Sequence, residues 1–514
     1  MRDWLTLKPH FIILAMVPIE LIAAIAVGHP PFRKLKKSYQ YAIAAMLWRW
    51  STVRHRHVKY PDSIFLSKED VKGLWGHFDT MTRHMGSDYF RVIAKDYENH
   101  QTNAYRPFDF LIGILIRFLA ERRTVRFLDK VGNPLKVPTN PIKSLAAPDK
   151  NTGKVKKSVW AGVRCATKIA VDVYSLEFLA ESASDPFLRL EAFRLIQMSQ
   201  NVDSPGFIPL QYEQKSTGRI VEIRSNFQNT PREVLGFALM DRWDYDVENA
   251  HFSILAQWAK RLGKLTPCID NYLNNKKQLR DDLAKHCDAP VHAIKEGLIA
   301  IIYGVEFTSY AKYTSLGSVF GEASYQKFIG HPEVAQLYKE VGTLRQLIVN
   351  DMPRRAGGFG NPMGIYVQAS NSSGDLKRLL CHALQGAEAL ALKTILTHYG
   401  EHILLAMHDG WVSDVQLPIQ AMEEKIVEAL GFALRIEECR LPKVGLNVTI
   451  QDETYNFSDK SQINQSFTEI LREYLVSNRA PAVGGLTDSV LRANWNRPEI
   501  VRELIAQRKL QRSS

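Results

Sequence analysis

The chain has 514 residues, 45% hydrophobic and 23% charged, an ordinary globular composition, and this length predicts about two to four subdomains rather than one core. Lysine and arginine outnumber aspartate and glutamate by 66 to 54, and the net charge of +12 favours an anionic partner such as nucleic acid or a membrane surface. The five cysteines form no CxxC pair, which argues against a zinc site or a disulfide framework and favours an intracellular setting.

The N-terminal stretch Phe11–Val27 is nearly continuous apolar sequence, and the basic run Arg33-Lys34-Leu35-Lys36-Lys37 follows it. This order is typical of a short membrane anchor with a positive flank. The stretch is only about 17 residues long and contains Pro18 and Glu20, whereas a spanning helix needs about 20 clean residues. We therefore predict a buried helix of an N-terminal domain, with weak membrane association through residues 11–27 as the alternative.

Residues 1–130 are predicted to form a helical region, because apolar stretches such as Tyr41–Trp50 and Phe108–Ala120 are separated by basic clusters. Residues 132–158 are rich in Pro, Gly, Asn and Lys, which predicts a basic loop that either contacts a phosphate backbone or is a solvated linker. Helical patterning resumes over Val159–Ser199.

Short β-like runs follow, separated by turn residues and by one long helical stretch. The predicted strands are Ile220–Ile223, Leu235–Met240, His402–Met407 and Trp411–Val415. This arrangement predicts a small antiparallel sheet that is interrupted by a helical insertion. After about Thr449 the tail is polar, with two predicted helices at Ser466–Val476 and Leu486–Gln507.

Two aspartates stand where such a sheet could bring them together. Asp246 ends the run LGFALMDRWDYD just before an amphipathic helical pattern, and Asp409 lies in the turn of the candidate hairpin HILLAMHDGWVSDV. Taken singly, each could be only a helix cap or a turn residue. As a pair on neighbouring strands, they predict a site for two Mg²⁺ ions, or Mn²⁺ in their place, of the kind that phosphoryl transfer to a 3′-hydroxyl needs.

A third element carries a cation and an aromatic side chain. Ala293–Phe307 is predicted to be an amphipathic helix on which Lys295, Ile299 and Tyr303 recur every four residues and share one face. Such a face could hold the triphosphate, sugar and base of a nucleotide, or it could be an ordinary core helix with an exposed lysine.

The segment STGRIVEIRSNFQNTPR, residues 216–232, resembles the family A DNA polymerase segment usually written TGR…NLQNIP. Later segments resemble further motifs of this family, in the family's order. They are DVENAHFSILA from Asp246 (motif A), K-x7-YG at Lys295 and Tyr303-Gly304 (motif B), HALQGAEAL around Gln385, and His408-Asp409 (motif C). The resemblance covers roughly residues 205–450.

The resemblance implies an α+β right-hand polymerase fold, with an antiparallel palm sheet and helical fingers. The implied parts are a basic loop and thumb-like helices in 131–204, palm in 205–260 and 371–450, fingers in 261–370, and a helical tail in 451–514. Asp246 and Asp409 would bind the metal ions, Lys295 the triphosphate, and Tyr303 with Gly304 would lie near the new base pair. The side chains implied to line the primer–template groove are Arg219, Asn226, Gln228, Asn229, Gln385 and His408.

The sequence also departs from the family pattern. Val291 replaces the arginine four residues before Lys295, so triphosphate binding would rely on His292, Lys285 or another basic residue. Ile299 stands in place of an expected aromatic residue, and Gly410 in place of the glutamate that follows the HD pair.

His251 stands five residues after Asp246, where DNA-making members carry a glutamate that closes the pocket against a 2′-hydroxyl. A histidine is bulky enough to exclude a ribose, but it could also donate to or accept from a hydroxyl. Single-subunit RNA polymerases carry an HFS sequence further from the aspartate than His251-Phe252-Ser253, and this spacing favours DNA synthesis.

We therefore predict an intracellular DNA polymerase that adds dNTPs to a primer on a template, as a compact replicase of a virus, phage or plasmid. The roughly 200 residues before the matching region contain no persuasive DxE constellation, which predicts no proofreading domain. One alternative is an RNA-making or RNA-copying polymerase on the same fold. The other is a non-catalytic nucleic-acid-binding scaffold, which would not need both acids together with Lys295 and Tyr303.

Overall fold

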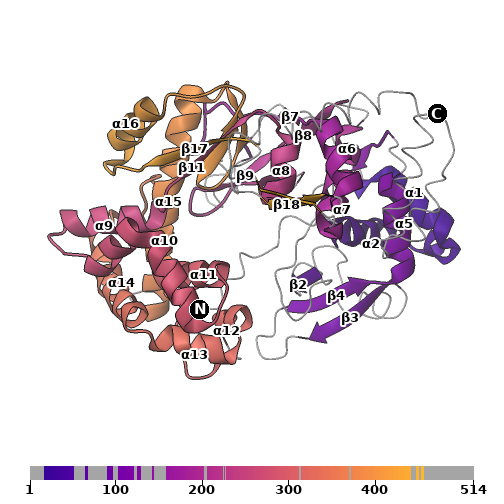
Figure 1. The fold of residues 1–514 in the computed structure, drawn as a ribbon. Helices are drawn as coiled ribbons and strands as arrows, with labels where there is room; N and C mark the ends of the chain where they lie inside the picture. Colours follow the sequence, from indigo (N-terminus) through magenta and orange to yellow (C-terminus); the bar gives the residue numbers. More distant parts are fainter. Residues whose placement is uncertain are drawn as a thin grey trace.

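The computed structural model describes residues 17–50, 64–67, 89–95, 102–120, 124–128, 142–143, 158–183, 185–201, 205–223, 225, 227–311, 314–369, 372–441, 447–450 and 453–456. These residues form a mixed fold of helices and small sheets (Figure 1). Both predicted tail helices, Asn226 and most of the predicted basic loop lie outside them.

A four-stranded antiparallel sheet of order β15-β16-β11-β17 organises the C-terminal half. Its strands are Trp243–Val247 (β11), Ile403–Ala406 (β15), Gly410–Ser413 (β16) and Ile436–Arg440 (β17). Tyr245 stacks on Trp411 with ring centroids 5.7 Å apart, and strand alternation turns Asp246 to the other face. Helices α15 (Ser373–Tyr399) and α16 (Ile419–Leu430) pack against each other and against this sheet. The predicted sheet with a helical insertion is confirmed in part, because helices separate β11 from β15 in sequence, but the predicted strand Ile220–Ile223 corresponds to β10 (Ile220–Glu222), which belongs to another sheet.

One predicted strand is wrong. Leu235–Met240 falls mainly in helix α8 (Arg232–Ala238), and the strand that carries Asp246 begins only at Trp243. A short apolar run is compatible with a buried helix as well as with a strand. Here Pro231 caps the start, Glu233 lies in the first turn, and the run from Val234 to Ala238 is buried.

The insertion consists mainly of helices, gathered at one end of the molecule below the sheet (Figure 1). They are α9 (Ala250–Arg261), α10 (Pro267–Cys287), α11 (Val291–Ile302), α12 (Ser315–Phe320), α13 (Glu322–Gly330) and α14 (Pro332–Asp351). A three-stranded sheet follows, β12 (Arg354–Arg355), β13 (Gly358–Gly360) and β14 (Tyr366–Gln368). Helix α11 ends five residues before the predicted Phe307, because the chain turns at Gly304, where φ is +80°.

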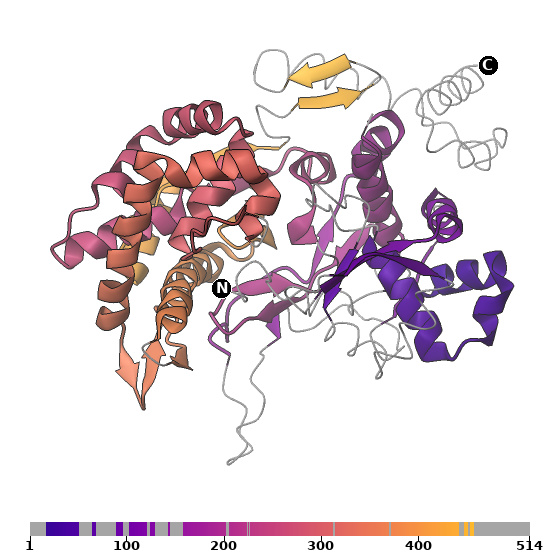
Figure 2. The same cartoon turned by 90° about the horizontal axis from the view of Figure 1, so that it is seen from below.

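The N-terminal region lies at the opposite end from the helical insertion in both views (Figures 1 and 2). Its helices are α1 (Ile19–Gly28), the 3₁₀ helix η1 (Pro30–Lys34), α2 (Lys37–Trp50) and α5 (Asp109–Ala120). The prediction of a helical region is incomplete, because β2 (Ile64–Ser67), β3 (Phe90–Lys95) and β4 (Thr102–Pro107) form a sheet of order β2-β4-β3. This pairing joins segments far apart in sequence, which a local pattern does not record.

The candidate membrane segment is a folded part of this region. Residues Val17–Pro18 (β1) pair with Phe127–Leu128 (β5), and α1 is only ten residues long, with Leu21 and Ile25 buried. Glu20 accepts a hydrogen bond from the Arg126 backbone NH. Among the described helices, α15 alone is long and apolar enough to cross a membrane, and most of it is buried inside the protein. The described part of 11–27 therefore matches the predicted buried helix.

The segment between the two ends mixes short strands with helices, so the prediction of a continuous helical pattern over Val159–Ser199 is only partly right. Helices α6 (Val173–Ser182) and α7 (Pro186–Ser199) form, but Lys168–Ala170 (β7) pairs with Phe207–Pro209 (β8). The other small strands are β6 (Ile142–Lys143), β9 (Tyr212–Gln214), β10 (Ile220–Glu222), β18 (Asn447–Ile450) and β19 (Glu453–Asn456); η2 spans Phe227–Asn229. Strand β19 lies in the part predicted as a helical tail.

Candidate functional site

The sheet brings the two predicted acids together. Asp246 pairs in register with Gly410, the residue after Asp409, and the Val247 backbone NH donates to the Asp409 carbonyl at 2.8 Å. Asp409 is exposed in the turn between β15 and β16, and the Asp246 side chain is 32% exposed. Two carboxylates, one on β11 and one in the turn before β16, are thus open to solvent at one end of the two central strands.

Two cationic side chains, Arg232 and Lys295, lie close to these acids. Arg232, at the start of α8, places Nη2 4.0 Å from Asp246 Oδ2. Burial, Arg280 and Arg232 lower the pKa of Lys295, while Asp246 and Asp409 act in the opposite direction. Lys295 on α11 is therefore within electrostatic reach of both acids, and Arg280 on α10 is within reach of Lys295, with its guanidinium also bonded to the Tyr272 hydroxyl. Such a cluster offers an anion a ready site beside the carboxylates.

Behind the acids, a buried carboxylate anchors a polar network. The Glu388 side chain on α15 is 3% exposed. It forms an ion pair with Arg219, and its Oε2 atom lies 2.8 Å from His251 Nε2. The other ring nitrogen, His251 Nδ1, lies 2.9 Å from the Tyr303 hydroxyl. Burial acts to raise the pKa of Glu388, but Arg219 and His251 outweigh it and lower that pKa to about 2. Glu388 is therefore ionised at neutral pH, and His251 bridges it to Tyr303.

Two further predicted residues join the network. Gln385, one helical turn before Glu388, hydrogen-bonds the Tyr303 hydroxyl. His408 is influenced electrostatically by Arg219 and Glu388, and burial together with Arg219 lowers its pKa, which favours the neutral imidazole. The structure thus assembles Arg219, His251, Tyr303, Gln385 and His408 from five separate segments beside the acid pair.

Other predicted residues are placed differently. The Gln228 amide bridges backbone groups, accepting from Glu222 N at 2.8 Å and donating to Ala406 O at 2.7 Å, so it joins β10 to β15. Asn229 is exposed at the end of η2. The groove contacts expected of these two residues stay predictions, and Gln228 would have to make its contact with an amide already engaged.

The face of α11 is as expected in part. Ile299 is half-buried between Lys295 and Tyr303, and His292 is exposed in the first turn. A Cβ at Gly304 would come within 2.8 Å of Lys377 Cγ, so the turn after Tyr303 tolerates little but glycine. Lys285 is exposed on α10, and among the described residues no contact joins it to the acids.

The acid pair fits hard divalent cations. Its side chains supply only oxygen donors, are reachable from solvent and are fixed by strand pairing, which suits Mg²⁺. Within the described part of the chain, no group of three or more His, Cys, Asp or Glu side chains is arranged to hold a metal ion. The pair would therefore need water or substrate oxygens to complete coordination, as is usual for Mg²⁺.

Sequence reasoning missed Glu388, Arg232 and Arg280. Glu388 had a signal, because it is an acid in the otherwise apolar run of α15 and lies one turn after Gln385. Arg232 ends the segment 216–232 but was assigned no role there, Arg280 stands outside any motif, and only the fold brings them near Lys295.

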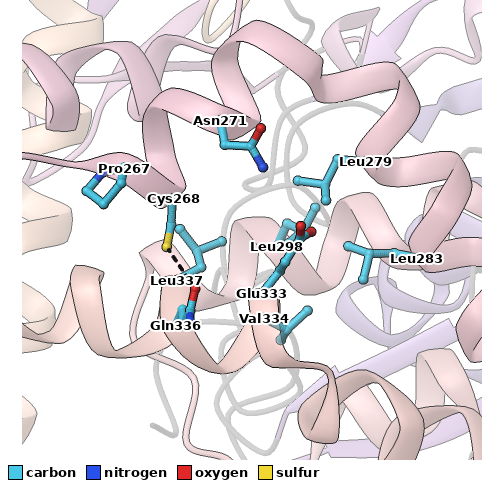
Figure 3. Close-up of a pocket in the computed structure, with 10 residues that line it drawn as sticks. All are labelled: Pro267, Cys268, Asn271, Leu279, Leu283, Leu298, Glu333, Val334, Gln336 and Leu337. Carbon is cyan, nitrogen blue, oxygen red and sulfur yellow. Dashed lines mark hydrogen bonds between the residues drawn. The ribbon is translucent and has the colours of Figure 1, made fainter.

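The helical insertion also contains a cavity of about 170 Å³ between α10, α11 and α14 (Figure 3). It is lined by Pro267, Cys268, Asn271, Leu279, Leu283, Leu298, Glu333, Val334, Gln336 and Leu337. None of these residues belongs to the acid pair, its cations or the Glu388 network. The cavity is therefore separate from the candidate site.

Comparison with known proteins finds similarity of low extent, and only to solved structures. No family model matches the chain, and no curated protein matches it. Among solved structures, the chain is similar to the POL domain of Pol1 from M. smegmatis, determined in complex with DNA primer-template and dNTP. The two are 17% identical with a TM-score of 0.36, and the match covers 53% of this chain and 56% of that one. The chain thus spans about half the length of that structure.

Proposed function

We propose that the protein is a template-directed DNA polymerase that joins dNTPs to a primer 3′-hydroxyl and resembles the family A enzymes. The observation that carries this proposal is the close placement of Asp246, on β11, and Asp409, in the turn before β16, with Val247 N bonded to Asp409 O at 2.8 Å and Arg232 and Lys295 nearby. Metal-assisted transfer of a nucleotide from its triphosphate requires carboxylates that bind the metal ions and nearby cations that bind the phosphates.

Each group of residues in the site has its own role in this proposal. Asp246 and Asp409 would hold Mg²⁺, which supplies charge neutralisation for the attacking oxygen and the leaving group. Lys295, Arg232 and Arg280 would bind the triphosphate and hold it in line with the primer end. The Glu388 network would fix His251 and Tyr303 as a rigid wall beside the nucleotide, with His251 held through both ring nitrogens.

The decisive experiment is extension of a labelled primer–template in Mg²⁺, with dNTPs and NTPs offered separately. We expect the wild type to extend with dNTPs and to stop when the metal is chelated. Asp246→Asn and Asp409→Asn keep the side-chain shape and should each lose at least about 100-fold in rate.

A matched control is Asp241→Asn, because Asp241 lies just before β11, is exposed and paired with Arg440, and has a φ of +63° that asparagine also adopts. It should keep full activity. Extension only with NTPs would favour the RNA-making alternative. Activity that survives both acid substitutions, or its absence on every template offered, would refute the proposal.

A further inference from the structure

The N-terminal region carries a group of aromatic rings that the candidate site does not use. His29, at the end of α1, lies 4.8 Å from the Phe110 ring and 5.4 Å from the Tyr89 ring, between ring centroids. Phe108 is nearly parallel to Phe110, at 15°, with centroids 6.4 Å apart. Tyr89 is buried, His29 and Phe108 are half-buried, and Phe110 is 36% exposed. We call His29, Phe108 and Phe110, with Tyr89 beneath them, the aromatic patch.

Cations border this patch. The Arg91 guanidinium lies 5.4 Å from the centre of the Phe108 ring and is exposed. The 3₁₀ helix η1 packs against Tyr89, the buried ring of the patch, since Phe32 contacts Tyr89 with ring centroids 6.1 Å apart. Directly after Phe32 comes the basic run 33–37, whose Arg33, Lys34, Lys36 and Lys37 are all exposed. The basic run is therefore connected to the aromatic patch through the contact between Phe32 and Tyr89.

The backbone of the basic run is held in place. Gln40 Nε2 donates to the carbonyls of Phe32, Arg33 and Leu35 at 2.9 to 3.3 Å, and Arg33 Nε donates to Ala26 O at 2.8 Å. Among the described residues, no acid forms an ion pair with Lys34, Lys36 or Lys37, and the nearby Asp109 pairs with Arg106 at 3.7 Å. The backbone of the run is thus held in place, and no ion pair with a described acid offsets the charge of these three lysines.

We propose that the aromatic patch and the basic run form a binding site for single-stranded nucleic acid. Phe110, the most exposed of these rings, can stack with an unpaired base, and the neighbouring cations can contact the adjoining phosphates. A duplex presents no free base faces to such rings. A lipid surface would need an apolar helix face to insert, whereas Leu21 and Ile25 of α1 are buried in the fold. Single-stranded DNA or RNA fits both the rings and the charge.

This site is separate from the acid pair. Helices α1 and α5 and strands β3 and β4 lie at the opposite end of the molecule from α9–α14, in both views (Figures 1 and 2). The site would therefore hold a strand outside the nucleotide pocket. It does not depend on the proposed polymerase activity, because its assay measures binding without any nucleotide turnover.

The test is fluorescence anisotropy of a labelled dT12 oligonucleotide with the full chain, with an unlabelled hairpin primer–template in excess to occupy the acid-pair site. A Lys34→Ala, Lys36→Ala and Lys37→Ala triple variant should bind dT12 at least about tenfold more weakly at low salt. Its slope of log affinity against log salt should be smaller by about 2, because each lost contact to a single strand contributes about 0.7. Phe110→Ala should weaken binding about fivefold or more with an unchanged slope.

The matched control removes the same charge elsewhere, by alanine at Lys260, Lys264 and Lys339, all exposed on the helical insertion. We expect it to bind dT12 like the wild type. Equal losses in the control and in the basic-run variant would overturn the proposal. So would a basic-run variant that loses binding to phosphatidylserine vesicles but keeps its affinity for dT12. Primer extension on the short hairpin should be the same in the wild type and in the Phe110→Ala variant, which separates this site from the polymerase proposal.

Discussion

Replacing Glu388 with glutamine removes the buried negative charge that Arg219 and His251 share, while keeping the shape of the side chain. The pKa of Glu388 falls from 4.5 to about 2 in the folded protein. This difference of about 2.5 units corresponds to about 3 kcal/mol of stability at neutral pH, at about 1.4 kcal/mol per unit. Glu388 is only 3% exposed, so solvent screening reduces this value little. We expect Glu388→Gln to lower the free energy of unfolding by about 3 kcal/mol at pH 7.

The pH dependence has a definite sign. Because the folded pKa is depressed, the stabilisation is fully present above the unfolded pKa near 4.5 and is lost as the pH falls toward 2. The difference between wild type and Glu388→Gln should therefore shrink from about 3 kcal/mol at pH 7 to about 1 kcal/mol at pH 3. A purely steric effect of the amide would not change with pH.

Urea unfolding followed by tryptophan fluorescence, at several pH values between 7 and 3, measures this difference. Glu401→Gln is the matched control, because Glu401 pairs with Arg164 at 3.8 Å and both side chains are exposed, by 65% and 80%. Its loss should stay below about 1 kcal/mol, as for other exposed ion pairs. A Glu388→Gln loss as small as that of the control, or one that is constant from pH 7 to 3, would refute the assignment of Glu388 as the ionised anchor of the network.

Four other substitutions test the nucleotide pocket. Lys295→Ala and Arg232→Ala should each raise KM for dNTP about tenfold with a smaller change in kcat, measured by steady-state extension, whereas a loss confined to kcat would contradict a role in triphosphate binding. Gly410→Ala should abolish extension in a folded protein, checked by circular dichroism, because its Cβ would lie 2.3 Å from the Tyr245 carbonyl of β11; full activity would show that the strands adjust. Tyr303→Phe removes the hydroxyl bonded to His251 and should reduce the preference for dNTP over NTP about three- to tenfold, measured as the ratio of kcat/KM values; an unchanged ratio would exclude the bond from sugar selection.

The acid pair could be predicted because its evidence is local. An aspartate at the end of an apolar run and another in an Asp-Gly turn each mark a strand end, and the antiparallel sheet confirms that β15, β16 and β11 are neighbours. The strand predicted at Leu235–Met240 failed for the same reason that others succeeded. Its apolar run is short, and burial on all sides in α8 leaves no period that distinguishes helix from strand.

The rest of the site depends on contacts between distant segments. Arg232 and Arg280 come within electrostatic reach of Lys295 only in the fold, since they lie on α8 and α10 and Lys295 lies on α11. The sheet of β2, β3 and β4 likewise pairs strands whose partners the sequence does not name. These features follow from tertiary packing, for which one sequence offers no periodic signal.

The Glu388 network also changes the meaning of His251. Judged by its own position, His251 replaces an acid and leaves two nitrogens available to a ribose hydroxyl. In the fold the carboxylate comes from α15 instead, and both nitrogens are already engaged, Nε2 with Glu388 and Nδ1 with Tyr303. A 2′-hydroxyl would have to displace one of these bonds and leave a buried group unpaired, at a cost of about 1–3 kcal/mol. That cost corresponds to about 5- to 150-fold against NTPs, which is why the proposed polymerase should prefer dNTPs although the family's glutamate is missing.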